Sequence, residues 1–512
     1  MRRDNGSNVP SPPDDEELAA CLRVLESIVE DRGRLAGLPE EMRNRLVRAA
    51  GMVARPDTIA RKRLAMTYRR SELATKREHD LKLLDAAGNR ATRRKVSHIQ
   101  PGSTGHALDL PDLTPLLGDG SGEPTTDPAT PGLLASRSCY VCKQRFVQVH
   151  HFYDSLCPPC ADLNFAKRFQ TARLDGRVAI VTGARIKIGF QAALMLLRAG
   201  ARVIVTSRFP VDAAERYSKE PDFDAWKDRL EVHALDLRHL GAVERLGRHL
   251  AQTLPRLDIL IHNAAQTVRR PPAYYASLAE AEERTLAGLD ARVRPLLPNT
   301  TAGLVAMQHE GSLALPSRLS QIALMPGDDA GAEHFPPGAL DLDEQQIDLR
   351  DKNSWRMKLA DVPTIELVEV HVVNAVAPFV LTRELRALLA RDRTDEKHVI
   401  NVSAMEASYA RRKKTDKHPH TNMAKAALNM MTRTSAEDFI GDGIHMNSVD
   451  TGWVTDEDPL HHVERKQRIH DFHPPLDAID GAARVCDPLF DGLLRGDHAW
   501  GRFFKDYKPV AW

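Results

Sequence analysis

Four cysteines give the clearest chemical signal in this sequence. Cys139 and Cys142 form one C-x-x-C pair, and Cys157 and Cys160 form a second pair after fourteen intervening residues. Two such hairpins can point four thiolates at one tetrahedral Zn²⁺, as in zinc ribbons and knuckles. Because all four ligands are cysteine, no coordination position stays open, and we expect the zinc to be structural. Two redox C-x-x-C motifs are the alternative, but neither pair opens a helix after a strand.

A second signal is a phosphate-binding turn within RVAIVTGARIKIGFQAALMLLRAG, which starts at residue 177. The pattern predicts a strand over residues 177–181, a turn that begins at Thr182 and Gly183, and a helix from about Gly189. Backbone N–H groups in such a turn, together with the positive end of the helix, can hold a pyrophosphate.

The next predicted strand ends in Ser207 and Arg208 instead of an acidic residue. An acid at this point would bind a ribose 2′-hydroxyl, whereas an arginine suits a 2′-phosphate. NADP(H) is therefore favoured, with NAD(H) as the alternative.

Further along the chain, Asp236-Leu237 follows a third strand and Asn263-Ala264-Ala265 follows a fourth. With these landmarks in order, residues 174–453 resemble the short-chain dehydrogenase/reductase family, whose turn reads T-G-x-x-x-G-x-G. The resemblance implies an α/β fold with a doubly wound parallel sheet of the Rossmann type. The turn residues that it aligns are Thr182, Gly183, Ala184, Arg185, Lys187, Ile188 and Gly189.

Lys187 stands where the family has its middle glycine. A glycine lets the backbone approach the phosphates closely. The lysine either leaves a slightly remodelled turn that still binds a dinucleotide, with an added positive charge, or it blocks the phosphate site.

The resemblance also implies an active site of asparagine, serine, tyrosine and lysine. Asn374, Ser403 and Lys425 match three of these residues, and Thr421 stands at the tyrosine position. After the sixth strand, Gly452 matches the glycine of the loop beside the nicotinamide. Asp236 is expected at the adenine, and residues 263–265 are expected beside the ribose.

A threonine is a poor replacement for the phenol. Its hydroxyl is much less acidic than that of tyrosine, and its side chain is too short to reach the same atom. Substitutes for the proton donor are His418, His420, Glu406 and Tyr409, of which Tyr409 and His420 are favoured. We expect an NADP(H)-dependent oxidoreductase with an altered proton donor that acts on a carbonyl or alcohol. The alternative is an inactive dinucleotide-binding protein that acts through partner recognition.

An insertion at about residues 267–350 separates the fourth strand from the helix that carries Asn374. The carboxyl ends of parallel strands face the ligand crevice, so the insertion is expected to lie over it. Arg269, Arg270, Tyr274 and Tyr275 could meet an anionic or aromatic group there. A surface elaboration or an oligomer contact is the alternative.

The remaining chain supplies the modules that position these residues. Residues 1–97 are predicted to be helical after a disordered start, and residues 98–137 form a linker rich in Gly, Pro, Ser and Asp. A cysteine module over residues 138–170 and a Rossmann domain over residues 171–512 follow.

Composition limits the partners of this 512-residue chain. Its net charge is +1, so no chain-wide field favours nucleic acid or an anionic membrane. An uninterrupted apolar run of membrane length and a secretory signal are both lacking in the sequence. Six cysteines, four of them clustered, suit a reducing compartment. We therefore expect a cytoplasmic protein that is a homo-oligomer, takes a small-molecule substrate, and binds neither membrane nor nucleic acid.

Overall fold

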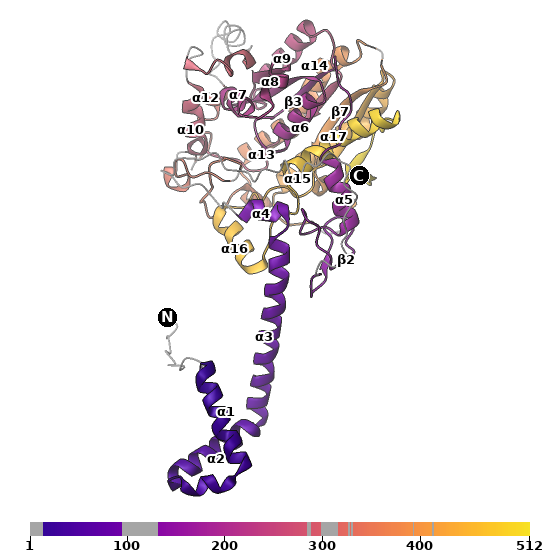
Figure 1. Cartoon of the computed structure of the whole chain (residues 1–512). Helices are drawn as coiled ribbons and strands as arrows, with labels where there is room; N and C mark the ends of the chain where they lie inside the picture. The colour runs from indigo at the N-terminus through magenta and orange to yellow at the C-terminus, as the bar shows by residue number, and fades with distance from the viewer. Residues whose placement is uncertain are drawn as a thin grey trace. The chain divides into compact units, whose positions relative to one another are not determined.

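The computed structural model describes residues 14–94, 132–283, 288–297, 316–325, 328, 331–341, 343–392, 394–411 and 414–512. The predicted disordered start and most of the predicted linker lie outside these residues, as does part of the insertion. The chain divides into two units, Met1–His79 and Asp80–Trp512 (Figure 1).

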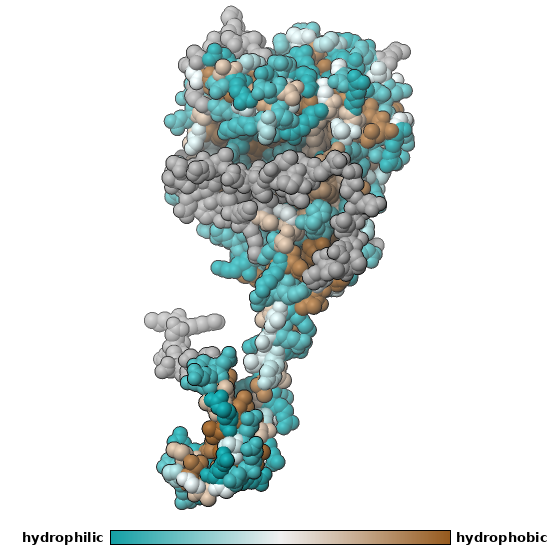
Figure 2. All heavy atoms as spheres, in the orientation of Figure 1, coloured by the Kyte–Doolittle hydropathy of each residue, from teal (hydrophilic) through white to brown (hydrophobic). Residues whose placement is uncertain are grey.

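The first unit is helical. It consists of α1 (Asp15–Glu30), η1 (Arg32–Gly37), α2 (Glu40–Ala54) and most of α3 (Thr58–Asp85). A capping box starts α1, because the Asp14 carboxylate accepts from the Glu17 N–H and the Glu17 carboxylate accepts from the Asp14 N–H. Neither α1 nor α2 contains a buried residue, and hydrophobic side chains are visible on the surface of this unit in Figure 2.

The second unit is built on one eight-stranded sheet with the strand order β10-β9-β8-β7-β6-β3-β4-β5. Every neighbouring pair is parallel except β9 and β10, which are antiparallel. The strands are β3 (Val178–Thr182), β4 (Arg202–Ser207), β5 (Leu230–Ala234), β6 (Ile259–His262), β7 (Lys397–Ser403), β8 (Ile444–Asp450), β9 (Phe503–Lys505) and β10 (Lys508–Val510). The order reverses at β3, which pairs with both β4 and β6, and this confirms the predicted doubly wound parallel sheet.

Helices cover both faces of the sheet, as Figure 1 shows. Ala179 and Val181 of β3 belong to one hydrophobic cluster with α6 and α17, whereas Val178 and Ile180 belong to a second cluster with α9 and α14. This alternation is the two-residue period of a strand that is buried on both faces. The helices are α4 (Gly88–Arg94), α6 (Lys187–Arg198), α7 (Pro210–Ser218), α8 (Phe223–Trp226), α9 (Leu240–Thr253), α10 (Pro272–Glu282), α12 (Pro316–Leu319), α13 (Thr364–His371), α14 (Ala377–Leu389), α15 (Pro419–Ile440), α16 (Leu460–His470) and α17 (Ala478–Arg495). Short 3₁₀ segments are η3 (Lys227–Arg229), η5 (Arg294–Leu296), η6 (Ala332–His334), η7 (Ser354–Arg356), η8 (Leu359–Asp361) and η10 (Met405–Ala407), and η9 (Val372–Val376) is a π-helix.

The cysteine module belongs to this second unit. The hairpin of β1 (Arg137–Ser138) and β2 (Arg145–Phe146) carries the first cysteine pair in its turn, and the second pair lies at the start of α5 (Pro158–Lys167).

One helical run in the described part of the chain, Thr364–Leu389, is long and apolar enough to cross a membrane. Half of its most apolar stretch is buried inside the protein. Val380, Leu381 and Leu385 of this run pack in the cluster that covers the sheet, so the run is a core helix of this fold.

Three histidines gather at the amino ends of β7 and β8, away from the carboxyl ends. His398 Nε2 lies 3.0 Å from His498 Nδ1, and the His445 ring lies 4.8 Å from that of His498. Burial lowers the pKa of each of these imidazoles below its ordinary value. We refer to His398, His445 and His498 as the histidine cluster.

Candidate functional site

A cleft of about 1800 Å³ lies at the carboxyl ends of the parallel strands. The phosphate turn, the ends of β4, β5, β6, β7 and β8, the start of α15, and α16 all line it. The structure brings nearly all the predicted cofactor residues to this cleft: Gly183, Arg185, Lys187, Ile188, Gly189, Ser207, Arg208, Asp236, Leu237, Asn263, Ala264, Ala265 and Gly452. Thr182 and Ala184 are buried behind the same turn.

The phosphate turn is held by Asn263, which follows β6. Its Nδ2 donates to the carbonyl oxygens of Thr182 (3.1 Å) and Gly183 (3.0 Å). Gly183 has a φ of 66°, and a Cβ at this residue would lie 2.7 Å from Ala264. A Cβ on Gly189 would lie 2.3 Å from Asn263 Nδ2. Both glycines are therefore needed for the close packing of this turn.

Lys187 has a φ of 54°, the left-handed conformation that the glycine of the family pattern would favour at this position. Its Nζ lies 3.4 Å from a Glu457 carboxylate oxygen and 3.7 Å from one of Asp343. Burial lowers the pKa of Lys187, but Glu457, Asp343 and Asp341 outweigh burial and raise it above its ordinary value. The charge of Lys187 is thus already matched by carboxylates, two of which come from the insertion.

Arg208, which is predicted to bind the 2′-phosphate, contacts a tyrosine. Its guanidinium lies 4.6 Å from the centre of the Tyr275 ring and donates to the Tyr275 hydroxyl at 2.9 Å. Burial raises the pKa of Tyr275, but Arg208 outweighs burial and lowers it. Among the described residues, no carboxylate forms an ion pair with Arg208. The positive charge of the Arg208 guanidinium is therefore available to bind an anion in the cleft.

Asp236, predicted at the adenine, is buried, and its carboxylate accepts hydrogen bonds from Arg238. Arg238 also lies 3.3 Å from Glu369. Arg238 thus fixes the Asp236 carboxylate at the wall of the cleft.

Four of the predicted catalytic residues line the cleft: Asn374, Ser403, Thr421 and Lys425. Asn374 lies in the π-helix η9, where its Nδ2 donates to the Gln266 carbonyl oxygen (3.0 Å) and its Oδ1 accepts from the Gln266 N–H (2.7 Å). Such π-helical turns are frequent at functional sites. The Lys425 Nζ donates to the Val402 carbonyl oxygen at 2.6 Å, and burial lowers the pKa of Lys425 to about 8.

Ser403, which ends β7, has a hydroxyl oxygen that is suited to bind a ligand. Its side chain is buried at the cleft, and its Oγ has no hydrogen-bond partner among the residues that the structure describes. A buried hydroxyl without a partner is costly, so this atom is suited to a ligand oxygen.

Thr421 does line the cleft, but its hydroxyl is occupied. The Oγ1 donates to the His418 carbonyl oxygen at 2.7 Å, a hydrogen bond at the start of α15. His418 precedes α15 with a φ of 41°, and its ring stacks on Trp355 at 4.0 Å. His418 Nδ1 lies 3.2 Å from Asn422 Oδ1. Burial lowers the pKa of His418.

Of the other three candidate proton donors, Glu406 alone lines the cleft. His420 is buried and does not line the cleft, and it lies 3.3 Å from the Glu366 carboxylate. Tyr409 is 84% exposed and is not among the residues that line the cleft. Glu406 does line it and forms an ion pair with Arg411. Of the two histidines, only His418 lines the cleft.

The insertion contributes one wall of the cleft. Arg270 forms ion pairs with Asp348 and Glu457, and Tyr274 and Tyr275 pack with Phe209 in a small hydrophobic cluster. These contacts place Arg270 and both tyrosines at the cleft.

Arg269 instead pairs with Glu369 and Asp328 in the protein interior. Sequence reasoning missed Trp355, Glu457 and Asp343, because no motif or period distinguishes them from neighbouring residues.

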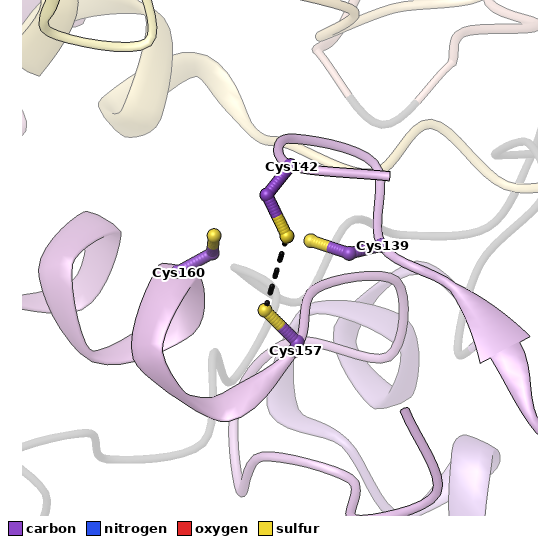
Figure 3. A group of neighbouring side chains, drawn as sticks. All are labelled: Cys139, Cys142, Cys157 and Cys160. Carbon is purple, nitrogen blue, oxygen red and sulfur yellow. Dashed lines mark hydrogen bonds between the residues drawn. The ribbon is translucent and has the colours of Figure 1, made fainter. Parts of the chain in front are cut away.

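The four predicted cysteine ligands come together in space. The Sγ atoms of the four cysteines all lie within 4.8 Å of one another. Figure 3 shows the four sulfurs directed toward a common point, with Cys142 and Cys157 3.6 Å apart. This cluster could hold a metal ion, and four thiol ligands suit tetrahedral Zn²⁺.

Comparisons with known proteins identify related sequences. Two family models match the chain: short chain dehydrogenase over residues 177–287 and enoyl-(acyl carrier protein) reductase over residues 350–474. An uncharacterized protein of Acanthamoeba polyphaga mimivirus is 30% identical over 377 residues, which cover 69% of this chain and 71% of that protein. Dehydrogenase/reductase SDR family member 13 of Bos taurus is 38% identical over 107 residues, 21% of this chain and 26% of that protein.

Solved structures give weaker likenesses. The Pseudomonas aeruginosa RhlG/NADP active-site complex has a TM-score of 0.40 and 18% identity, covering 65% of this chain and 95% of that one. Carbonyl reductase Sniffer of D. melanogaster has a TM-score of 0.41 and 15% identity, covering 66% of this chain and all of the other. At these scores the fold assignment rests on the strand order of the chain itself.

Proposed function

Because this chain belongs to the short-chain dehydrogenase/reductase family, we propose that it is an NADP(H)-dependent oxidoreductase that interconverts a carbonyl compound and its alcohol. The observation that carries this proposal is the Ser403 hydroxyl, which has no partner among the described residues and lies in the same cleft as Lys425 and Asn374. These residues suit a reaction in which one oxygen of a small molecule gains or loses a proton.

The cleft fits a dinucleotide with a 2′-phosphate. Gly183 and Gly189 allow the tight turn that is proposed to take the pyrophosphate, because no side chain fits at either residue, and Arg208 has no carboxylate ion pair among the described residues. When bound, NADPH supplies a hydride to the carbonyl carbon of the substrate. Lys187 contributes less positive charge to the phosphate end than its sequence suggests, since Glu457 and Asp343 pair with it.

We assign the proton transfer to His418. The Ser403 Oγ would donate a hydrogen bond to the carbonyl oxygen and orient it. As hydride arrives at carbon, the imidazolium of His418 would give its proton to that oxygen, and the neutral ring would then be left. Trp355, stacked on the ring, fixes its plane, and Asn422 engages Nδ1, so Nε2 is the nitrogen proposed to face the substrate. An imidazolium can act as a general acid, and since burial lowers the pKa of His418, its protonated form gives up the proton more readily than an exposed imidazolium would.

We also propose that the four cysteines hold a structural Zn²⁺. The chemistry of the donor set is the support, since four thiolates leave no position for a substrate or water.

A second candidate function is dinucleotide binding without turnover, coupled to partner recognition. It is favoured by Thr421, which replaces the expected phenol and whose hydroxyl donates to the His418 carbonyl oxygen.

The test is a NADPH titration followed by turnover with a panel of carbonyl compounds. The titration follows NADPH fluorescence, and turnover follows the loss of absorbance at 340 nm. We expect saturable binding and turnover that falls at least 100-fold in Ser403→Ala and in His418→Gln. Tyr409→Phe, at an exposed residue, is the matched control and should keep its rate. Binding with no turnover on any carbonyl would favour the second candidate, and no binding at all would refute both.

A further inference from the structure

The cysteine module and the cleft share one hydrophobic core. Phe146, Tyr153 and Leu156 of the module form a cluster with Val454 and Leu476, which lie in the segment between β8 and α17. Ile188 of the phosphate turn packs against the same cluster. The module therefore supports both the turn and the loop after β8, the two elements that flank the cleft in this region.

Tyr140, between the first two cysteines, makes a direct polar contact with that loop. Its hydroxyl oxygen accepts the Trp453 backbone N–H at 2.9 Å. A Cβ at Gly452 would lie 3.3 Å from the same oxygen, so the phenol closely approaches the loop backbone. Tyr140 also lines the cleft.

The loop is held on its other side by β8 and β9. The Gly452 N–H donates to Asp450 Oδ1 at 2.8 Å, and the Lys505 Nζ lies 3.3 Å from Asp450 Oδ2 and 5.7 Å from the centre of the Tyr140 ring. Tyr140, Lys505 and Asp450 thus form a continuous set of contacts around Gly452.

We propose that the metal centre of the four cysteines is a positioning element of the cofactor site, which acts through Tyr140 on the loop over residues 451–458. A metal bound at Cys139 and Cys142 fixes the short turn between them, and Tyr140 projects from this turn. Fixing Tyr140 fixes the Trp453 N–H and, through it, the wall of the cleft beside Gly452. Because coupling is reciprocal, a dinucleotide in the cleft must also strengthen the hold on the metal. The dinucleotide is the one named in the proposed function, whereas the coupling of metal to loop stands apart from it.

The first experiment measures backbone hydrogen exchange by mass spectrometry on the full chain, with Zn²⁺ bound and after removal of metal by a chelator. We expect the peptide over residues 451–458 to exchange at least ten-fold faster without metal, while peptides from β7 do not change. Tyr140→Phe separates the phenol from general loss of the module, because the ring is kept. It should retain one Zn²⁺ per chain by elemental analysis, yet show faster exchange at residues 451–458. Tyr68→Phe, at an exposed residue of α3, is the control.

The second experiment measures NADPH affinity in the same proteins. Loss of one hydrogen bond predicts a Kd about five-fold weaker for Tyr140→Phe than for the wild type. Unchanged exchange at residues 451–458 in both the metal-free protein and Tyr140→Phe would overturn the inference. If NADPH does not bind the wild type, the proposed function fails, and the exchange data still decide whether the metal holds the loop.

Discussion

Gly189→Ala is the most direct test of the phosphate turn, because the structure leaves no room for the added methyl group. The new Cβ would lie 2.3 Å from Asn263 Nδ2, 2.5 Å from the Gly183 carbonyl oxygen and 3.0 Å from Ala184 Cα. Two of these neighbours are backbone atoms, so the turn itself must shift. Overpacking of this kind costs about 1–3 kcal/mol. Loss of the two hydrogen bonds from Asn263 costs about 1 kcal/mol each.

Together these terms predict a loss of about 3–5 kcal/mol in the free energy of unfolding of the second unit. NADPH affinity should fall at least ten-fold, since the displaced backbone is the proposed phosphate site. Urea unfolding followed by tryptophan fluorescence isolates this unit, because all five tryptophans lie within Asp80–Trp512.

Gly441→Ala is the matched control, since a Cβ there meets no atom within 4 Å and the φ of −60° suits any residue. It should change the free energy of unfolding by less than about 1 kcal/mol. A Gly189→Ala protein as stable as the control, with NADPH affinity within two-fold of the wild type, would refute the packing argument and the placement of the phosphate site.

Four further predictions concern charge, metal and pH. Arg208→Ala should weaken NADPH binding at least ten-fold and leave NADH affinity within two-fold, as measured by fluorescence titration; an equal loss for both would contradict a 2′-phosphate contact. Cys157→Ser should lower bound Zn²⁺ from about one per chain toward zero by elemental analysis, whereas Cys21→Ser should not change it. Burial lowers the pKa of His418 below its ordinary 6.5, so carbonyl reduction, which consumes the protonated form, should slow as pH rises through that lowered value; a flat pH–rate profile would argue against this residue. Burial also lowers the pKa values of the histidine cluster, so the folded protein keeps these rings neutral. Their contribution to stability is complete above about pH 6.5, the ordinary histidine pKa, and is lost as pH falls below it. The free energy of unfolding should fall by about 1.4 kcal/mol per pH unit for each proton that the folded state excludes. Urea unfolding at pH 7.5 and 5.5 should show this loss, and His398→Gln should reduce it.

Much of the fold could be predicted from the sequence because its signals are local. The strand, turn and helix that begin at residue 177 follow from apolar periodicity and two glycines, and the strand order matches the doubly wound sheet expected from the landmarks that follow. The cysteine spacing likewise predicted a cluster. Two residues within each pair and fourteen between the pairs let all four thiols meet at one point, as the structure shows.

The proton donor could not be predicted in the same way. His418 and His420 are two residues apart, and the sequence does not say which one faces the cleft. His418 precedes α15 in a left-handed conformation that places its ring on Trp355, whereas His420 faces Glu366 on α13. Trp355 comes from a segment far along the chain, so this choice depends on tertiary packing.

The ion pairs of Lys187 could not be predicted from the sequence either. Its carboxylate partners lie more than 150 residues away, in the insertion and after β8. The cytoplasmic location, the homo-oligomeric state and the domain boundaries stay predictions from the sequence.

The core shared by the cysteine module and the cleft sets a lower limit on the length of a soluble fragment. A truncated chain that begins at residue 171 would keep Val454, Leu476 and Ile188 but lose the side chains that cover them. Newly exposed apolar surface of this kind favours self-association. The dehydrogenase-like region should therefore aggregate when it is produced without residues 138–170, even though its sheet, its cleft and its proposed catalytic residues would all be present.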